Sequence, residues 1–165
     1  PVQGVVWYSK SLYNSGIHFL NLMIYFFGPP KGSSILTKDI RKIPKKDIAP
    51  SFILEFKNVK IMFISIHEQG IFLNEFKLIF SNGVLNYCNA GEDIEWFNSL
   101  NNQVTFSNKA IEKFGEKITS NFKKMQSNVC SELKEIIEGK NGHICDSQLA
   151  YKTEKLLSSI IEKNF

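Results

Sequence analysis

Residues 10–28, Lys-Ser-Leu-Tyr-Asn-Ser-Gly-Ile-His-Phe-Leu-Asn-Leu-Met-Ile-Tyr-Phe-Phe-Gly, predict a helix that is apolar around most of its circumference. At about 100° per residue, one line of polar side chains spans only about 60° of that helix. The line consists of Asn14, His18, Asn21 and Tyr25, and Lys10 extends it if the helix begins earlier. Burying amide, imidazole and phenol groups costs free energy unless they meet partners or a polar ligand. We therefore expect the functional site along this line.

The ends of this helix carry recognisable signals. Asn14 can cap the free amides of the first turn, so we expect the helix to begin there. Gly28-Pro29-Pro30 predicts its end, because glycine favours the residue after a helix and proline cannot continue one.

Alternating apolar residues predict a run of strands after this helix. Phe52, Leu54 and Phe56 share one face of the clearest strand, and Asn82-Gly83 is typical of a hairpin turn between two others. The predicted strands cover residues 33–40, 52–57, 59–66, 74–80, 84–88 and 93–97, the last being the final strand.

Helical spacing returns at the end of the chain. Apolar residues predict a helix over 117–138 closed by Gly139, and Asp146 is expected to cap a final helix. The predicted fold is a single α+β domain over 1–165, with a largely antiparallel open sheet of about five to six strands covered on one face by helices.

The opposite face of the predicted sheet is apolar as well. Ile53, Met62, Ile64, Ile66 and Ile79 lie on the side away from the phenylalanines. An uncovered apolar face usually marks an interaction surface. We expect it to pack against another subunit, so that the protein is a homo-oligomer.

Composition excludes several classes of function. The chain has 165 residues, 43% hydrophobic and 22% charged, which is typical of a globular protein. Its net charge of +4 is spread along the sequence with Arg41 as the only arginine, so nucleic-acid binding is not expected. The longest apolar run, 19–27, is too short to span a membrane. Cys88, Cys130 and Cys145 match neither a disulfide framework nor a zinc site. We therefore expect reduced thiols and a cytoplasmic location.

His18 is the histidine with two competing interpretations. It can be a core histidine satisfied by a nearby carbonyl, or the proton carrier of a pocket lined with amides, since histidine gains and loses a proton near neutral pH. Asn14 could likewise serve only as the helix cap, and Tyr25 could place its hydroxyl at the rim. His67 and His143 belong to predicted turns, and no metal is expected.

The same residues resemble a known family. Tyr8-Ser-Lys10, followed by Asn14-Ser-Gly-Ile-His18 and the Phe27-Gly28 stop, resembles the signature of the second domain in the glucose–fructose oxidoreductase/inositol dehydrogenase family. The strands, the Ser81-Asn-Gly83 hairpin and the helix opened by Asp146 follow in the same order, so that the likeness spans nearly the whole chain.

This resemblance implies the substrate-binding and oligomerisation domain of an NAD(P)-dependent oxidoreductase acting on a sugar or sugar derivative. NAD or NADP would be bound mainly by an N-terminal Rossmann domain that these residues lack, and the chain alone would be inactive. His18 would take the proton of a sugar hydroxyl, while Asn14 and Lys10 would hydrogen-bond substrate hydroxyls or a carboxylate.

Two departures keep other functions open. Asn14 and Asn21 stand where the family commonly has aspartate, and an amide cannot stabilise a protonated imidazole as a carboxylate would. The alternative is a non-catalytic binding or assembly module that keeps the fold without the chemistry. A third interpretation is a stand-alone binder of sugar-like small molecules.

Overall fold

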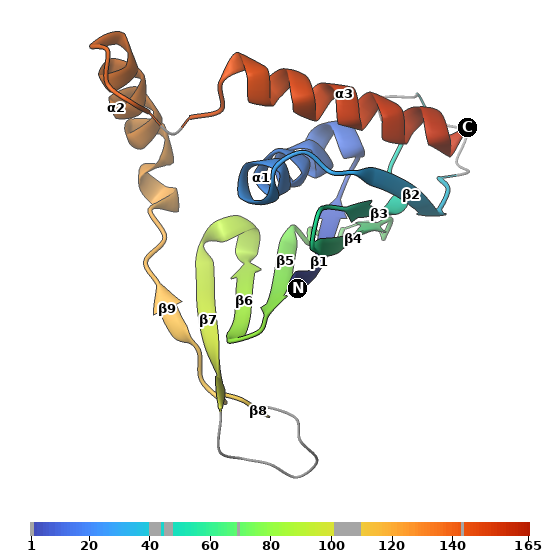
Figure 1. Ribbon diagram of the computed structural model, residues 1–165, viewed down its shortest axis with the longest axis horizontal. Coiled ribbons are helices and arrows are strands. Elements are labelled where there is room, and N and C mark those ends of the chain that lie inside the picture. Colours follow the sequence, from blue (N-terminus) through green and yellow to red (C-terminus); the bar gives the residue numbers. More distant parts are fainter. Residues whose placement is uncertain (1, 40–43, 45–47, 69, 101–109, 143) are drawn as a thin grey trace.

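A computed structural model describes residues 2–39, 44, 48–68, 70–100, 110–142 and 144–165. Within these residues, nine strands form one sheet, and helices cover one of its faces (Figure 1). The strands follow the order β2-β3-β4-β1-β5-β6-β7-β8, and β9 also pairs with β7. The α+β class is therefore confirmed, but the sheet has more strands than the sequence predicted.

The elements have the following bounds. The strands are β1 (Val2–Ser9), β2 (Gly32–Thr37), β3 (Ser51–Glu55), β4 (Val59–Ile66), β5 (Glu75–Phe80), β6 (Gly83–Cys88), β7 (Asp93–Leu100), β8 (Ala110–Ile111) and β9 (Glu116–Ile118). The helices are α1 (Ile17–Phe27), α2 (Met125–Ile137) and α3 (Ser147–Asn164), with a π turn η1 (Leu12–Gly16) and 3₁₀ turns η3 (Asn89–Gly91) and η4 (Phe122–Lys124).

The strand β1 lies in the middle of the sheet, and the sequence patterns did not predict it. It pairs in parallel with β4 and antiparallel with β5, so the sheet is mixed. Val6 and Tyr8 are fully buried on one face, while Val5 and Trp7 alternate with them on the other. A strand with apolar residues on both faces gives no alternation in its sequence, which explains why it was missed.

The hairpin predicted at Asn82-Gly83 is confirmed, and a second hairpin joins β3 to β4. β3 and β4 pair antiparallel after a short turn, and β4 has the predicted bounds. Phe80 pairs with Gly83 across the predicted Asn-Gly turn between β5 and β6.

The predictions after residue 93 need correction. β7 is followed by β8 and β9, so the strand at 93–97 is not the last one. Residues 116–118 pair with β7, and the helix predicted over 117–138 begins only at Met125. The apolar spacing of Ile118, Phe122 and Met125 fits a helix. Ile118 is nevertheless extended, because it pairs with Ile94 at the edge of β7.

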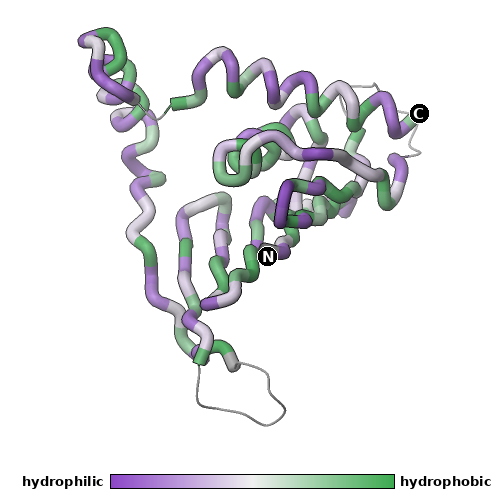
Figure 2. Tube along the Cα trace, in the orientation of Figure 1, coloured by the Kyte–Doolittle hydropathy of each residue, from purple (hydrophilic) through white to green (hydrophobic). Residues whose placement is uncertain are grey.

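The core lies between the sheet and a layer of two packed helices, α1 and α3 (Figure 1). Leu20 and Met23 of α1 and Leu157 and Ile160 of α3 are fully buried, together with the phenylalanines of β3 and β4. Figure 2 shows polar and apolar residues alternating along α3, as a helix with one buried face requires. Asp146 caps α3 as predicted, because its Oδ1 accepts from Leu149 N–H at 2.7 Å.

An arm formed by β9, η4 and α2 leaves the sheet edge and rises beside the helix layer (Figure 1). α2 buries none of its residues, and Val129, Leu133 and Ile137 on it are exposed apolar side chains. None of the helices in the described part of the chain combines the length and apolarity needed to cross a membrane.

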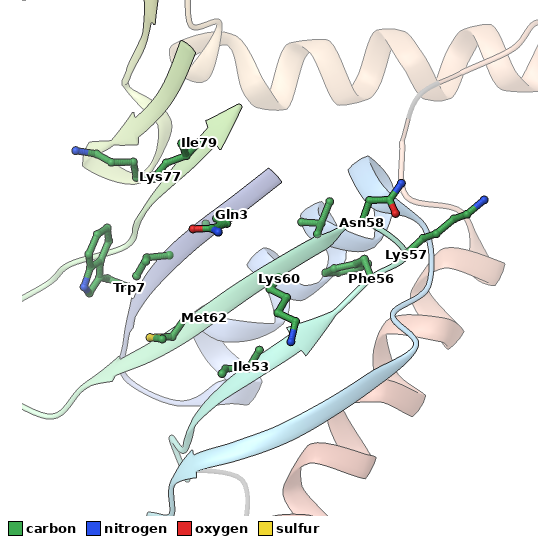
Figure 3. A pocket seen from close by; sticks show the side chains of 13 residues that line it. Gln3, Trp7, Ile53, Phe56, Lys57, Asn58, Lys60, Met62, Lys77 and Ile79 are labelled. Atoms are coloured by element: carbon green, nitrogen blue, oxygen red, sulfur yellow. The ribbon is translucent and has the colours of Figure 1, made fainter. Parts of the chain in front are cut away.

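The face of the sheet turned away from α1 is open. A hollow of about 570 Å³ lies on it, lined by β1, β3, β4 and β5 (Figure 3). Met62 and Ile79 are exposed on this outer face, as the alternation predicted, and Lys57, Lys60 and Lys77 also line the hollow.

Candidate functional site

A second cavity lies on the helix side of the sheet, where the start of α1 meets the arm. Its volume is about 460 Å³, within the range of small-molecule sites. Three of the five predicted site residues line it, namely Lys10, Asn14 and His18. The rest of the lining comes from Ser15, Phe19, Leu22, Phe72, Asn74, Tyr87, Ala90, Phe122 and Met125. The outer hollow is larger, but none of the described residues that line it is a histidine, and it presents mainly apolar side chains.

The chain enters α1 through an unusual turn. Ser11, not Asn14, is the capping residue, because its Oγ accepts from Asn14 N–H at 3.2 Å. The carbonyl of Ser11 also accepts from Asn14, Ser15 and Gly16 within the π turn. The prediction of an Asn14 cap is therefore wrong. Since the hydroxyl of Ser11 satisfies the backbone, the Asn14 side chain is left to face the cavity.

A line of buried polar groups holds Asn14 in place. Ser9 N–H donates to Asn74 Oδ1 at 3.0 Å, and Asn74 Nδ2 donates to Ser15 Oγ at 3.4 Å. Ser15 Oγ in turn donates to Asn14 Oδ1 at 3.4 Å. With its oxygen engaged in this line, Asn14 can offer the N–H groups of Nδ2 to a ligand.

Asn74 was predicted only as the first residue of a strand. It is 8% exposed, and its amide joins β1 to the π turn. A buried asparagine is unusual at a strand start, but its contact with Ser15 spans 59 positions of sequence. No local pattern could have assigned it to the site.

His18 lies in the first turn of α1 and is exposed at the cavity. Among the described residues, none forms a hydrogen bond with its ring. The interpretation of His18 as a sealed core histidine is therefore wrong. Its ring nitrogens are free to meet a ligand.

The other two predicted site residues lie elsewhere. Asn21 Nδ2 donates to Thr153 Oγ1 at 3.1 Å and to Cys145 Sγ at 3.2 Å, so this amide joins α1 to α3 and the loop before it. Tyr25 is 55% exposed beside the ring of Phe26. Neither residue lines the cavity. His67 is exposed, and its Nε2 forms a hydrogen bond with Ser65 Oγ at 3.0 Å. His143 lies outside the described residues.

Aromatic side chains form the apolar part of the cavity. Phe19 packs edge-on against Tyr87, whose ring stacks on Phe76. Tyr87 Oη donates to the carbonyl of Ala90 at 2.8 Å, and burial raises the pKa of Tyr87. Phe72, Phe122 and Met125 are exposed at the mouth. A cavity with an apolar wall and few polar groups is typical of a small-molecule site.

The cavity offers no evident place for a metal or a dinucleotide. Among the described residues, no three His, Cys, Asp or Glu side chains lie together as metal ligands would. The sequence contains no Gly-x-Gly-x-x-Gly loop to hold a pyrophosphate. The residues present therefore do not fit a nicotinamide dinucleotide by themselves, and we assign none of them to it.

Comparison with known proteins identifies the fold. No protein-family model matches the chain, and no curated protein is similar to it in sequence. Solved structures are similar over 98% of this chain. They include UDP-N-acetylglucosamine 3-dehydrogenase GnnA from Acidithiobacillus ferrooxidans (TM-score 0.67, 8% identity, 53% of that chain) and the dehydrogenase MviM from Clostridium difficile (TM-score 0.61, 15% identity, 53% of that chain).

A proposed NADPH-dependent oxidoreductase from Desulfitobacterium hafniense is similar to the same extent, with a TM-score of 0.67, 9% identity and 53% of that chain covered. The chain thus spans about half the length of these structures. At such low identity the likeness concerns the fold. The chain has the fold of one part of these oxidoreductases.

Proposed function

We propose that this chain is the substrate-binding and oligomerisation domain of an NAD(P)-dependent oxidoreductase acting on a sugar or sugar derivative. The family is the one that the Gly16-Ile-His18 helix resembles, that of glucose–fructose oxidoreductase and inositol dehydrogenase. The observation that carries the proposal is the gathering of Lys10, Asn14 and His18 in one cavity of ligand size. The fold of the solved oxidoreductases, one of them a UDP-sugar 3-dehydrogenase, supports it.

The residues of this cavity suit the oxidation of a hydroxyl group. Such a reaction removes a proton from the oxygen and a hydride from the carbon that bears it. The nicotinamide, held elsewhere, would supply the hydride acceptor. His18 would accept the hydroxyl proton at a ring nitrogen, and Asn14 Nδ2 would donate a hydrogen bond to a neighbouring oxygen of the sugar. Phe72 and Phe122 would cover the apolar face of the sugar ring.

The outer face of the sheet would serve assembly. Met62 and Ile79 are exposed on this face, and together with Trp7 they give an apolar lining to the hollow of about 570 Å³. Covering it with a second copy would remove this surface from water.

The first test of the proposal is to inspect the coding sequence around this chain. The coding region of this chain should also encode a Gly-x-Gly-x-x-Gly strand–helix unit. In the polypeptide that carries both, His18→Ala should lower kcat by about 10²–10⁴-fold, as expected for loss of a general base, while the Kd for NAD(P) stays unchanged. His67→Ala is the matched control and should keep kcat. An unchanged kcat in His18→Ala would remove this residue from the mechanism.

A non-catalytic binding module is the second candidate. It is favoured by the surroundings of His18, because no described carboxylate hydrogen-bonds its ring and Asn21 is engaged with α3. Under this alternative the chain binds sugars, but no polypeptide containing it reduces NAD(P) in their presence. Spectrophotometric turnover at 340 nm with a panel of sugars separates the two candidates.

A further inference from the structure

A groove along the arm continues the cavity. Phe122 and Met125 line both this arm groove and the cavity of Lys10, Asn14 and His18. A ligand whose sugar ring lies in the cavity therefore reaches the arm groove across these two side chains. The arm groove has a volume of about 350 Å³, and its lining consists of Asn121, Phe122, Met125, Asn128, Val129, Glu132 and Ile144.

One wall of the arm groove is an apolar stripe on η4 and α2. Phe122, Met125 and Val129 are spaced three and four positions apart, so they lie on one face of this helical segment. They are 40%, 52% and 42% exposed, and α2 buries none of its described residues. An apolar stripe left in water is typical of a surface that a ligand or a partner covers.

The loop that joins α2 to α3 forms the opposite wall. Asn21 Nδ2 donates to Cys145 Sγ at 3.2 Å, which ties this loop to α1. A Cβ added at Gly142 would overlap the Ile136 side chain, so the backbone of the loop also lies directly on α2. Between these two contacts, Ile144 lines the groove and is half-buried. Contacts on both sides therefore hold the second wall of the groove.

The charges of the arm groove indicate the kind of group that it takes. None of the described residues that line it is a lysine, an arginine or a histidine, and Glu132 is an acid. Lys123 and Lys124, at the start of the arm, line a different hollow together with Glu92 and Asp93. A phosphate or carboxylate group in the arm groove would thus meet a carboxylate and no cation of the lining, whereas an uncharged apolar group would lie against the stripe.

We propose that the substrate is an uncharged glycoside whose apolar aglycone lies in the arm groove. This inference rests on the proposed function and names its substrate class. The sugar ring lies in the cavity beside Asn14 and His18, and the aglycone leaves the anomeric carbon over Phe122 and packs on Met125 and Val129. Removal of this apolar surface from water is the source of the added affinity.

The test is a calorimetric titration of this chain with methyl and octyl β-D-glucopyranoside and with methyl and octyl β-D-galactopyranoside, each below its micelle-forming concentration. The two members of a pair carry the same sugar, so a difference within a pair comes from the aglycone. Burial of the additional methylene groups should make the octyl member bind at least about tenfold more tightly. Asn14→Ala should weaken the binding of both members by the same factor, because the sugar contact is common to them.

Three variants locate the aglycone. Val129→Glu places a charge on the stripe and should reduce octyl binding to the level of methyl binding, which stays unchanged. Ile137→Glu makes the same change at a residue of α2 that is 84% exposed and does not line the groove, so the octyl preference should remain. Met62→Glu makes the outer sheet face less apolar and should also keep the preference. Circular dichroism and the melting temperature check that each variant is folded.

Equal binding of methyl and octyl glycosides, or a preference that survives in Val129→Glu, overturns the inference and leaves the sugar site standing. A preference lost in Met62→Glu places the octyl chain on the outer face of the sheet and also overturns it. Sedimentation velocity shows whether the stripe pairs with a second copy, because a wild-type dimer that Val129→Glu dissociates would overturn the inference. Absence of binding by all four glycosides overturns the proposed function itself, and the inference with it.

Discussion

The two faces of this sheet are built from the same strands but differ sharply in burial. On the inner face, Phe63 is fully buried and stacks on Phe52 at 4.6 Å between ring centroids, under α1 and α3. On the outer face, its neighbour Met62 is 36% exposed. The inner face therefore stabilises the fold and positions the cavity at its margin. The outer face carries exposed apolar residues that contribute less to the fold, and the proposed assembly of two copies would cover them.

The largest expected effect comes from the core side of this comparison. Phe63→Ala should lower the free energy of unfolding by about 3–5 kcal/mol, because it leaves a void beneath the stacked ring of Phe52. Met62→Ala, one position away, should cost less than about 1 kcal/mol in dilute protein. Urea unfolding followed by tryptophan fluorescence measures both values. Similar losses in the two variants would show that the faces are not distinct.

The next effect concerns the outer face and self-association. Met62→Glu should weaken dimerisation at least about tenfold, because it places a charge in an apolar contact. Sedimentation velocity between about 5 and 200 μM would show the shift from dimer to monomer. Tyr151→Glu, an equally simple change at an exposed position of α3, is the control and should leave the dimer intact. A wild-type chain that stays monomeric over this range would contradict the proposed assembly.

The smallest effect separates two asparagines on one helix line. Asn21→Ala should cost about 1 kcal/mol of stability, since it removes the amide bond to Thr153, and should leave sugar binding unchanged. Asn14→Ala should weaken sugar binding and leave the free energy of unfolding almost unchanged. Thermal unfolding and titration with the tightest-binding sugar probe measure the two properties. Equal loss of sugar binding in both variants would show that Asn14 and Asn21 belong to one site, which would contradict the assignment of Asn21 to the contact with α3.

Local signals predicted a good part of the fold. The alternation in β4 gave its bounds, the Asn82-Gly83 turn gave the β5–β6 hairpin, and Asp146 marked the cap of α3. Gly28 ends α1 as expected, with a φ of +76° and its N–H on the carbonyl of Ile24 at 2.8 Å. These features depend on neighbours in sequence, so the sequence reveals them.

The candidate site was predicted only in part, and geometry explains the difference. Periodicity places Asn14, His18, Asn21 and Tyr25 on one line, but a helix rises about 1.5 Å per residue, so the ends of that line lie about 16 Å apart. The beginning of the line meets the arm and the Phe72 loop, whereas Asn21 meets α3. Which residues share a cavity depends on what packs against each turn.

The sequence by itself determined the α+β class, the bounds of β4, the β5–β6 turn, the end of α1 and the cap of α3, because turns, caps and alternation are encoded within a few residues. Only the tertiary structure decided that β1 lies parallel to β4 in the centre of the sheet, and that Asn74 and Phe72 join Lys10, Asn14 and His18. Those contacts join residues more than fifty positions apart. They form because burial of apolar surface brings distant segments together, and burial has no local signature.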